Sequence, residues 1–341
     1  MAADTVISTW FVSDDAGTAT YFPQTALRSD APEAKAIYWR CTVCFFASSI
    51  AKNPTSRHVF FTNTAVPLVD GCNIAALFDL WNVEVVSLPI TYRLPEGAVG
   101  SFGNQFYIFD ILDHLASDAS IQRAIVLDSD CLWIDSADTM EAAIDRHGAL
   151  TYLLYTQDRP IESEINGLSR VQMARFFRRH GGVDLPAIPY FGGEIYAARQ
   201  ECTKKISQHA RELWPVILEG APDAPREEAH FLSILYALNG IEGGTANPFI
   251  KRMWTAFRMN NLATSDKELT IWHLPVEKRT GFADLFRQVI ADPDLRPASD
   301  AHAMGLTFAN YQRLMGWPRR NPRKLAQDLR LKIAERLHRP S

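Results

Sequence analysis

Two aspartates one residue apart, Asp128 and Asp130, are the side chains whose type and spacing point most directly to chemistry. They follow the apolar run 125–127, which is typical of a short buried strand of a parallel sheet. Alternate side chains of an extended chain share a face, so both carboxylates can project the same way. Apolar residues follow at 131–134, and two carboxylates in such surroundings repel each other unless a cation joins them. Oxygen ligands suit Mg²⁺ or Mn²⁺ and leave coordination sites for phosphate, so we expect a metal–diphosphate site. A turn or helix N-cap containing two aspartates is the alternative.

A second acidic pair, Glu227 and Glu228, lies near the start of a helix predicted over 226–238. At helical spacings of three, four and seven, Glu228 shares a face with Phe231, Leu232 and Leu235. That apolar face predicts that Glu228 enters the core or a cleft, where a desolvated carboxylate needs a partner or a function. Two solvated glutamates of a first helical turn are the alternative.

Two further stretches supply candidate binding residues. Gly192 and Gly193 open an apolar segment and would let a ligand approach the backbone, although a simple turn fits the dipeptide equally well. The neighbouring Glu194 is a candidate acceptor for a sugar hydroxyl. His273 ends a predicted last strand over 269–274 and could complete a metal shell, with Lys278 neutralising phosphate. A structural histidine is the alternative at position 273.

Strands and helices that alternate along the chain must position these residues. Strands are predicted over 5–12, 58–62, 83–88 and 149–155, and helices over 33–51, 73–81, 104–115 and 137–146. This alternation predicts an α/β fold with a mostly parallel, Rossmann-like central sheet flanked by helices, whose ligands bind beyond the carboxyl ends of the strands. Thr9 and Asn63 are therefore candidate nucleotide contacts, and for Asn63 a role at the start of a loop is the alternative.

Composition limits the class of protein. The chain has 341 residues, of which 47% are hydrophobic and 22% charged, as in ordinary globular enzymes. A net charge of -4 argues against general nucleic-acid binding. The five cysteines favour a reducing compartment, and Cys41 and Cys44 fit a helix core better than a zinc or redox site. No signal sequence or spanning segment is evident, so we expect a cytoplasmic protein.

The segment 317–341 differs from the rest of the chain. It is rich in arginine and lysine, and Leu325, Leu329, Ile333 and Leu337 recur every four residues. This pattern predicts a basic amphipathic C-terminal helix that could lie on the anionic inner face of the plasma membrane. A terminal helix docked on its own domain is the alternative.

Several of these motifs occur in an order that resembles GT-A-fold glycosyltransferases. An aromatic segment, Phe102-Gly-Asn-Gln-Phe-Tyr-Ile-Phe109, leads into Ile125-Val-Leu-Asp-Ser-Asp130, as in the glycogenin and lipooligosaccharide-galactosyltransferase kind. The segments Tyr190-Phe-Gly-Gly193 and Glu227-Glu-Ala-His230 look like those of the blood-group type of retaining transferase. The resemblance extends from about Thr5 to Lys278 and excludes the tail.

The resemblance implies a nucleoside-diphosphate sugar donor, with a UDP-sugar favoured, and Mn²⁺ or Mg²⁺ bridging its diphosphate. Asp128 would contact ribose and metal, Asp130 the metal, and His273 would be the third ligand. Glu228 falls where the blood-group type has a candidate nucleophile, and Glu227 falls where a carboxylate holds the sugar. His230, beside them, would contact the acceptor or the sugar.

This sequence departs from the family pattern in two places. Gln105 stands where the family usually has lysine, so one diphosphate contact is missing. His273 and Lys278 are one residue closer than in the family, and the glycine between them is absent.

We therefore expect residues 1–316 to form a glycosyltransferase domain, with a nucleotide-binding part over about 1–135 and an acceptor part over about 136–290. The reaction would transfer a sugar, with retention, to a glycan or lipid-linked acceptor, with Glu228 stabilising the oxocarbenium-like centre or bonding to it. In an inverting enzyme Glu228 would instead be the base. Two rival hypotheses are a haloacid-dehalogenase-like phosphatase, with Asp128 as nucleophile, and a non-enzymatic sugar-nucleotide-binding protein.

Overall fold

The computed structural model describes residues 4–22, 24–25, 27–95, 103–154, 159–241, 243–256, 259–317 and 322–337. The chain divides into two compact units that each combine distant segments. The first unit contains residues 1–8, 87–127 and 138–248, and the second contains 9–86, 128–137 and 249–341. The division predicted near residue 135 follows the chain, whereas the observed units interleave along it.

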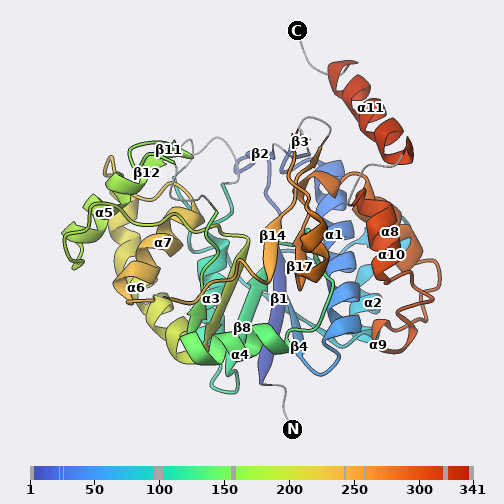
Figure 1. The fold of residues 1–341 in the computed structure, drawn as a ribbon, viewed down its shortest axis with the longest axis horizontal. Helices are drawn as coiled ribbons and strands as arrows, with labels where there is room; N and C mark the ends of the chain where they lie inside the picture. Colours follow the sequence, from blue (N-terminus) through green and yellow to red (C-terminus); the bar gives the residue numbers. More distant parts are fainter. Residues whose placement is uncertain are drawn as a thin grey trace. The chain divides into compact units, whose positions relative to one another are not determined.

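The main sheet has the strand order β10-β13-β8-β1-β4-β7. Figure 1 labels three of its strands, β8, β1 and β4. Its strands are β1 (Thr5–Phe11), β4 (Arg57–Thr62), β7 (Val83–Ser87), β8 (Arg123–Leu127), β10 (Ala149–Leu150) and β13 (Ile195–Arg199). β1 and β8 are parallel, whereas β13 runs antiparallel to both β8 and β10. With helices between its strands, this sheet confirms the predicted α/β class.

The first unit combines β8, β10 and β13 with helices. These helices are α3 (Tyr107–Ser117), α4 (Asp138–His147), α5 (Arg170–Arg179), α6 (Gln200–Leu218) and α7 (Glu228–Leu238), with a small hairpin of β11 (Glu164–Ile165) and β12 (Leu168–Ser169). Helix α5 begins with a capping box, in which Ser169 and Gln172 exchange side-chain-to-backbone hydrogen bonds that satisfy free amides of the first turn. Helix α7 is buried over every residue from Ala229 to Tyr236, so it has no solvent-facing stripe there.

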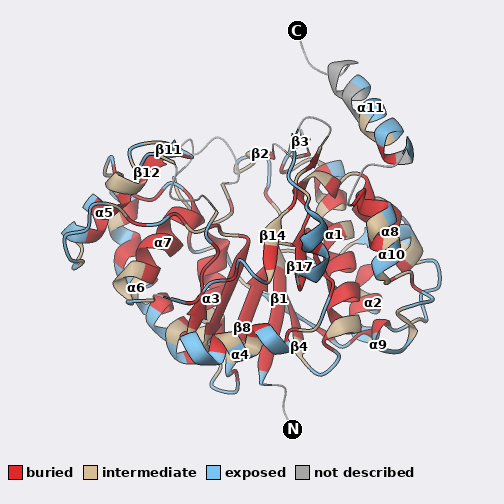
Figure 2. Ribbon diagram, in the orientation of Figure 1, coloured by how far each residue is buried: buried red, intermediate tan, exposed pale blue. Residues whose placement is uncertain are grey.

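The second unit is built around α1 (Pro32–Lys52), which packs against α8, α9 and β9. Figure 2 shows most of α1 as buried. The other helices of this unit are α2 (Ile74–Leu80), η1 (Thr264–Glu268), η2 (Pro275–Glu277), α8 (Gly281–Val289), α9 (Pro297–Asp300), α10 (Phe308–Met315) and α11 (Pro322–Leu337). Cys41 and Cys44 are buried free cysteines on α1, as expected of core residues.

A second sheet of three strands has the order β14-β17-β9. It is formed by β9 (Cys131–Trp133), β14 (Ile250–Arg252) and β17 (Ile271–His273). Three hairpins complete the unit, and they are β2 (Tyr21–Phe22) with β3 (Leu27–Arg28), β5 (Leu68–Val69) with β6 (Cys72–Asn73), and β15 (Thr255–Ala256) with β16 (Met259–Asn260).

Three elements differ from their predicted form. The strand predicted over 149–155 shortens to β10, followed by isolated bridges at Thr151 and Leu153. The segment 13–32, for which no strand was predicted, contains the β2–β3 hairpin. The last predicted strand is β17, which pairs with β9 and β14 in the second sheet. Among the described residues, no helix is long and apolar enough to span a membrane.

Candidate functional site

Asp128 and Asp130 lie in a turn that joins β8 to β9. The Cys131 amide donates to the Asp128 carbonyl at 3.2 Å, so the carboxylates converge from a turn and not from the extended strand that we expected. Strand β17 runs antiparallel to β9 with His273 opposite Cys131, and the Leu274 amide donates to the Asp130 carbonyl at 2.9 Å. The end of β17 is therefore fastened beside the turn, and this pairing positions the imidazole.

The three predicted metal ligands come together. Nε2 of His273 lies 3.5 Å from Oδ2 of Asp128 and 3.2 Å from Oδ2 of Asp130. One ligand atom from each residue fits within 4.8 Å of the others. The Asp128 side chain is 38% exposed, whereas that of Asp130 is 2% exposed, so the group opens outward on the Asp128 side. Two carboxylates and an imidazole are a donor set that suits Mn²⁺ and also admits Mg²⁺.

Lys278 adds a buried positive charge to this group. It follows η2, and its Nζ lies 2.5 Å from Oδ2 of Asp130 and 5.4 Å from the centre of the Tyr38 ring. Burial by itself would raise the pKa of the Asp130 carboxyl, but the charges of Lys278 and His273 outweigh burial and hold that pKa well below its usual range. Burial would likewise lower the pKa of Lys278, but Asp130 raises it. Lys278 and Asp130 therefore form a fully charged, buried ion pair.

A second buried ion pair lies one residue away along the chain. Lys324 of α11 donates to Glu277 and, at 2.8 Å, to the hydroxyl of Thr280, which itself donates to Glu277 at 2.7 Å. Glu277 also accepts a hydrogen bond from Thr255. This network, which sequence reasoning missed, anchors the first turn of α11. Lys324 is one of several basic residues of the tail, and nothing in its position along the sequence indicates that it is buried.

Three carboxylates gather in the first unit around a pair of glycines. A Cβ on Gly193 would lie 2.2 Å from Oε1 of Glu228, and a Cβ on Gly192 would lie 2.1 Å from Oε2 of Glu194. A side chain at either position would have to displace a carboxylate of the chain itself, and at position 192 a methyl group of Leu154 as well. The approach of a ligand to these glycines stays a prediction, and their contacts with Glu194 and Glu228 are a second reason for glycine at both positions.

Glu227 is the most firmly held of the three carboxylates. Tyr190 donates to its Oε1 and Asn166 to its Oε2, each at 2.6 Å. Burial raises the pKa of Tyr190 well above its usual value, and the charges of Glu227, Glu228 and Glu194 raise it further. The Tyr190 phenol therefore stays protonated as a donor, and Glu227 is fixed in orientation before any substrate arrives.

His230 lies in the core and not on an open surface. Its ring is fully buried, with Nε2 2.8 Å from the Ile165 carbonyl and Nδ1 accepting from the Arg226 amide at 3.4 Å. Burial lowers its pKa to about 4, so the ring is neutral at physiological pH. The imidazole connects the β11–β12 hairpin to α7, and its expected contact with the acceptor or the sugar stays a prediction.

The remaining predicted donor-binding positions are Asn63, Thr9 and Gln105. Both polar atoms of the Asn63 amide bind the Ser13 backbone, at 2.8 Å and 3.1 Å, which is the loop role named as the alternative. A nucleotide contact of Asn63 stays a prediction. Thr9 is fully buried in β1, and its hydroxyl has no hydrogen-bond partner among the described residues. Gln105 lies half-buried in the turn before α3, in the first unit.

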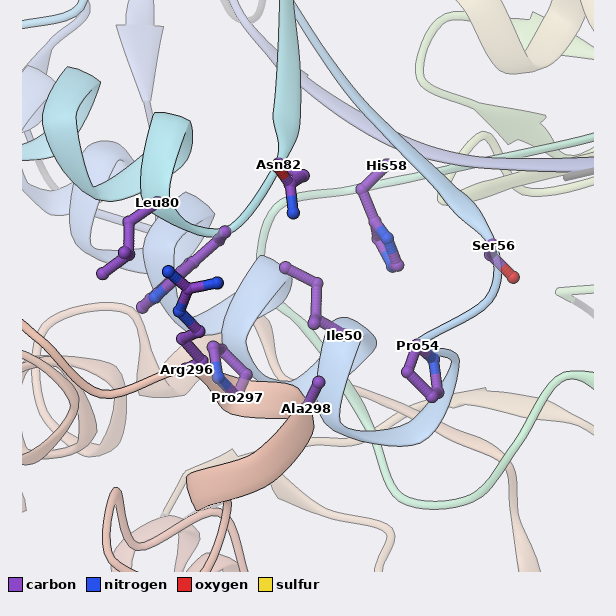
Figure 3. A pocket seen from close by; sticks show the side chains of 10 residues that line it. Ile50, Pro54, Ser56, His58, Leu80, Asn82, Arg296, Pro297 and Ala298 are labelled. Atoms are coloured by element: carbon purple, nitrogen blue, oxygen red, sulfur yellow. The ribbon is translucent and has the colours of Figure 1, made fainter. Parts of the chain in front are cut away.

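A small cavity of about 170 Å³ lies elsewhere in the second unit (Figure 3). Its walls include Ile50, Leu80, Trp81 and Pro297, with Arg296 at an exposed position. His58 also lines it, but the Nε2 of His58 lies 2.9 Å from the Ser49 hydroxyl. None of the residues predicted to do chemistry lines this cavity.

Comparison with protein-family models and with curated proteins finds no match. Among solved structures, an active-site mutant of LgtC is similar, at 14% identity and a TM-score of 0.44, over 79% of this chain and 86% of that one. A second similar structure is the galactosyltransferase LgtC in complex with donor and acceptor sugar analogues, at 13% identity and a TM-score of 0.43, with the same coverage. Any function assigned to this chain has to be argued from its own side chains.

Proposed function

We propose that this protein is a metal-dependent glycosyltransferase that takes a sugar from a nucleoside-diphosphate donor, with a UDP-sugar favoured. The observation that carries the proposal is the convergence of Asp128, Asp130 and His273 on one point beside the buried ammonium of Lys278. A divalent ion would neutralise the two carboxylates of this group, and the ammonium of Lys278 would then leave a net positive charge, which suits a diphosphate. Asp128, which is the more exposed carboxylate, would also contact a ribose hydroxyl.

Residues of the chain would contribute to the reaction in two ways, by stabilising charge and by fixing the position of the metal ligands. A divalent ion, when bound, would supply Lewis-acid stabilisation of charge on the departing diphosphate. Lys278 would supply a further positive charge to the same oxygens. His273 and Asp130 are held by strand pairing and burial, so their positions are set before the substrate binds.

We propose that the carboxylates of the first unit act on the sugar. Glu228 would stabilise the oxocarbenium-like centre or bond to it, giving retention, and Glu227, fixed by Tyr190 and Asn166, would hold the sugar hydroxyls together with Glu194. Were Glu228 instead the base for the acceptor hydroxyl, the product would be inverted. The anomeric configuration of the product, read by proton NMR, distinguishes these two mechanisms.

The acceptor is proposed to be a glycan or a lipid-linked saccharide, reached at an anionic membrane surface such as the inner face of the plasma membrane. Helix α11 supports this because Leu325, Leu329 and Ile333 are exposed on it, while Lys324 anchors its first turn. An apolar row on a basic helix is the pattern of a segment that lies in a lipid interface. The alternative is a terminal helix docked on its own domain, to which Lys324 fastens the first turn.

Release of UDP from UDP-sugars in the presence of Mn²⁺ tests the proposed activity. We expect slow hydrolysis of one UDP-sugar without acceptor and none in Asp130→Ala. The phosphatase hypothesis predicts phosphate release from p-nitrophenyl phosphate, abolished by Asp128→Ala, with UDP-sugars untouched. The binding-protein hypothesis predicts saturable binding of a UDP-sugar with no turnover under any acceptor condition.

A further inference from the structure

Two nitrogen atoms lie close to the same carboxylate oxygen in the candidate metal group. Nζ of Lys278 lies 2.5 Å, and Nε2 of His273 3.2 Å, from Oδ2 of Asp130. All three side chains are at most 5% exposed, so water does little to screen the ion pair. In the protein without a bound ion, the negative charge of Asp130 is thus already balanced by a cation of the chain.

A divalent ion that binds this group must share Asp130 with that ammonium. At separations of a few ångströms in a buried site, two cations on one carboxylate repel each other strongly. A diphosphate relieves the repulsion because its oxygens can accept both the metal and the ammonium. Lysine suits such an exchange, since its flexible stem and three rotatable donors allow it to leave a carboxylate for a phosphate.

We propose that Lys278 makes the binding of metal and diphosphate mutually dependent, by holding Asp130 until a diphosphate takes over its ammonium. This inference rests on the proposed function, because it assumes that Asp128, Asp130 and His273 hold the ion. It adds that the ion alone binds weakly and is captured as a metal–diphosphate complex. By linkage, the factor by which diphosphate strengthens metal binding equals the factor by which the metal strengthens diphosphate binding.

Titration of the full chain with Mn²⁺, followed by the electron paramagnetic resonance signal of the free ion, tests the proposal without any turnover. Inorganic pyrophosphate serves as the diphosphate, so the unknown base and sugar do not enter. In the unsubstituted protein, saturating pyrophosphate should tighten Mn²⁺ binding by about tenfold or more, after correction for binding of Mn²⁺ by pyrophosphate itself. In Lys278→Met, Mn²⁺ alone should bind about tenfold more tightly, and the gain from pyrophosphate should fall below about threefold.

Two further variants guard against a folding artefact. Lys278→Arg keeps the buried charge and pairs more rigidly with a carboxylate, so Mn²⁺ alone should bind at least as weakly as to the unsubstituted protein. Lys324→Met removes the neighbouring buried ammonium, which is paired with Glu277 and not with Asp130, and should leave the dependence on pyrophosphate intact. If Lys278→Met does not fold, two results support the proposal. Mn²⁺ alone should bind Lys278→Arg as weakly as it binds the unsubstituted protein, and Mn²⁺ binding to the unsubstituted protein should depend strongly on pyrophosphate.

The contradicting outcomes separate this inference from the proposed function. If Mn²⁺ binds the unsubstituted protein equally well with and without pyrophosphate, or if Lys278→Met gains no affinity, Lys278 is not the competing cation. Loss of Mn²⁺ binding in Asp130→Asn would still uphold the metal site in that case. If Mn²⁺ binds in neither condition, both the metal site and the inference are wrong.

Discussion

The carboxyl group of Glu228 occupies the space that a side chain on Gly193 would need, with its Oε1 2.2 Å from the position of the missing Cβ. The atom that would be displaced is the end of a flexible side chain, so a methyl group there can be accommodated by rotating the carboxylate away. This relationship makes the glycine a sensitive probe of Glu228, because it separates the position of the carboxylate from the stability of the fold.

We expect Gly193→Ala to lower the kcat of sugar transfer about tenfold or more while reducing the free energy of unfolding by only about 1 kcal/mol. Steady-state kinetics and urea unfolding of the same samples measure the two effects. Gly71→Ala is a matched control, because nothing lies within 4 Å of its missing Cβ, although both its positive φ and the added methyl can cost stability. Full activity in Gly193→Ala would mean that the orientation of Glu228 does not matter.

Asp130 and Asp128 should behave differently when each is changed to asparagine. Asp130→Asn leaves the ammonium of Lys278 buried without its carboxylate, and we expect it to cost about 3–5 kcal/mol of stability. Asp128 is 38% exposed, so Asp128→Asn should cost less than about 1 kcal/mol. Both variants should lose the thermal stabilisation that UDP with Mn²⁺ gives the unsubstituted protein. Equal stability losses would show that Asp130 is not held as described.

The buried imidazole of His58 should make stability depend on pH. Burial lowers its pKa from 6.5 to about 4, and its Nε2 lies 2.9 Å from the Ser49 hydroxyl. The unfolded chain takes up this proton near pH 6.5 and the folded chain only near pH 4, so stability falls as the pH drops through that window. The contribution of this residue is about 3 kcal/mol.

His58→Gln should therefore reduce the slope of the unfolding free energy against pH between pH 6.5 and 4. The reduction should correspond to the uptake of up to one proton on unfolding. Guanidinium unfolding at half-unit pH steps measures this slope. His230, whose pKa burial also lowers to about 4, should preserve a dependence of the same sign in the variant. An unchanged slope in His58→Gln would contradict the assignment of His58 as a neutral core residue.

Helix α11 should bind anionic vesicles through its apolar row. Leu329 is 61% exposed, so Leu329→Asp should leave stability within about 0.5 kcal/mol while abolishing co-sedimentation with phosphatidylglycerol vesicles. Phosphatidylcholine vesicles provide the neutral control, and binding should weaken as salt is raised. Equal recovery of the unsubstituted protein with both lipids would remove the case for a membrane role.

The ligands of the metal group could be predicted because each follows or ends an apolar run that is typical of a buried strand. The apolar run 125–127 indicates a buried strand before Asp128, and the segment 269–274 indicates a second strand that ends at His273. The pairing of β17 with β9, which brings His273 to the aspartates, depends on contacts between segments far apart in the chain. For the same reason the Lys324–Glu277 pair and the burial of His230 had no local signal. Asn63 is the opposite case. Its loop role follows from the local preference of asparagine for the start of a loop, and its hydrogen bonds to Ser13 agree with that role.

A crystal structure with Mn²⁺ and UDP, with manganese located by its anomalous scattering, tests the central claim most directly. We expect one manganese ion bound by the carboxylates of Asp128 and Asp130 and by Nε2 of His273, at about 2.2 Å, with diphosphate oxygens completing its shell. Manganese or the UDP diphosphate bound elsewhere, with Asp130 still paired only to Lys278, would contradict the account.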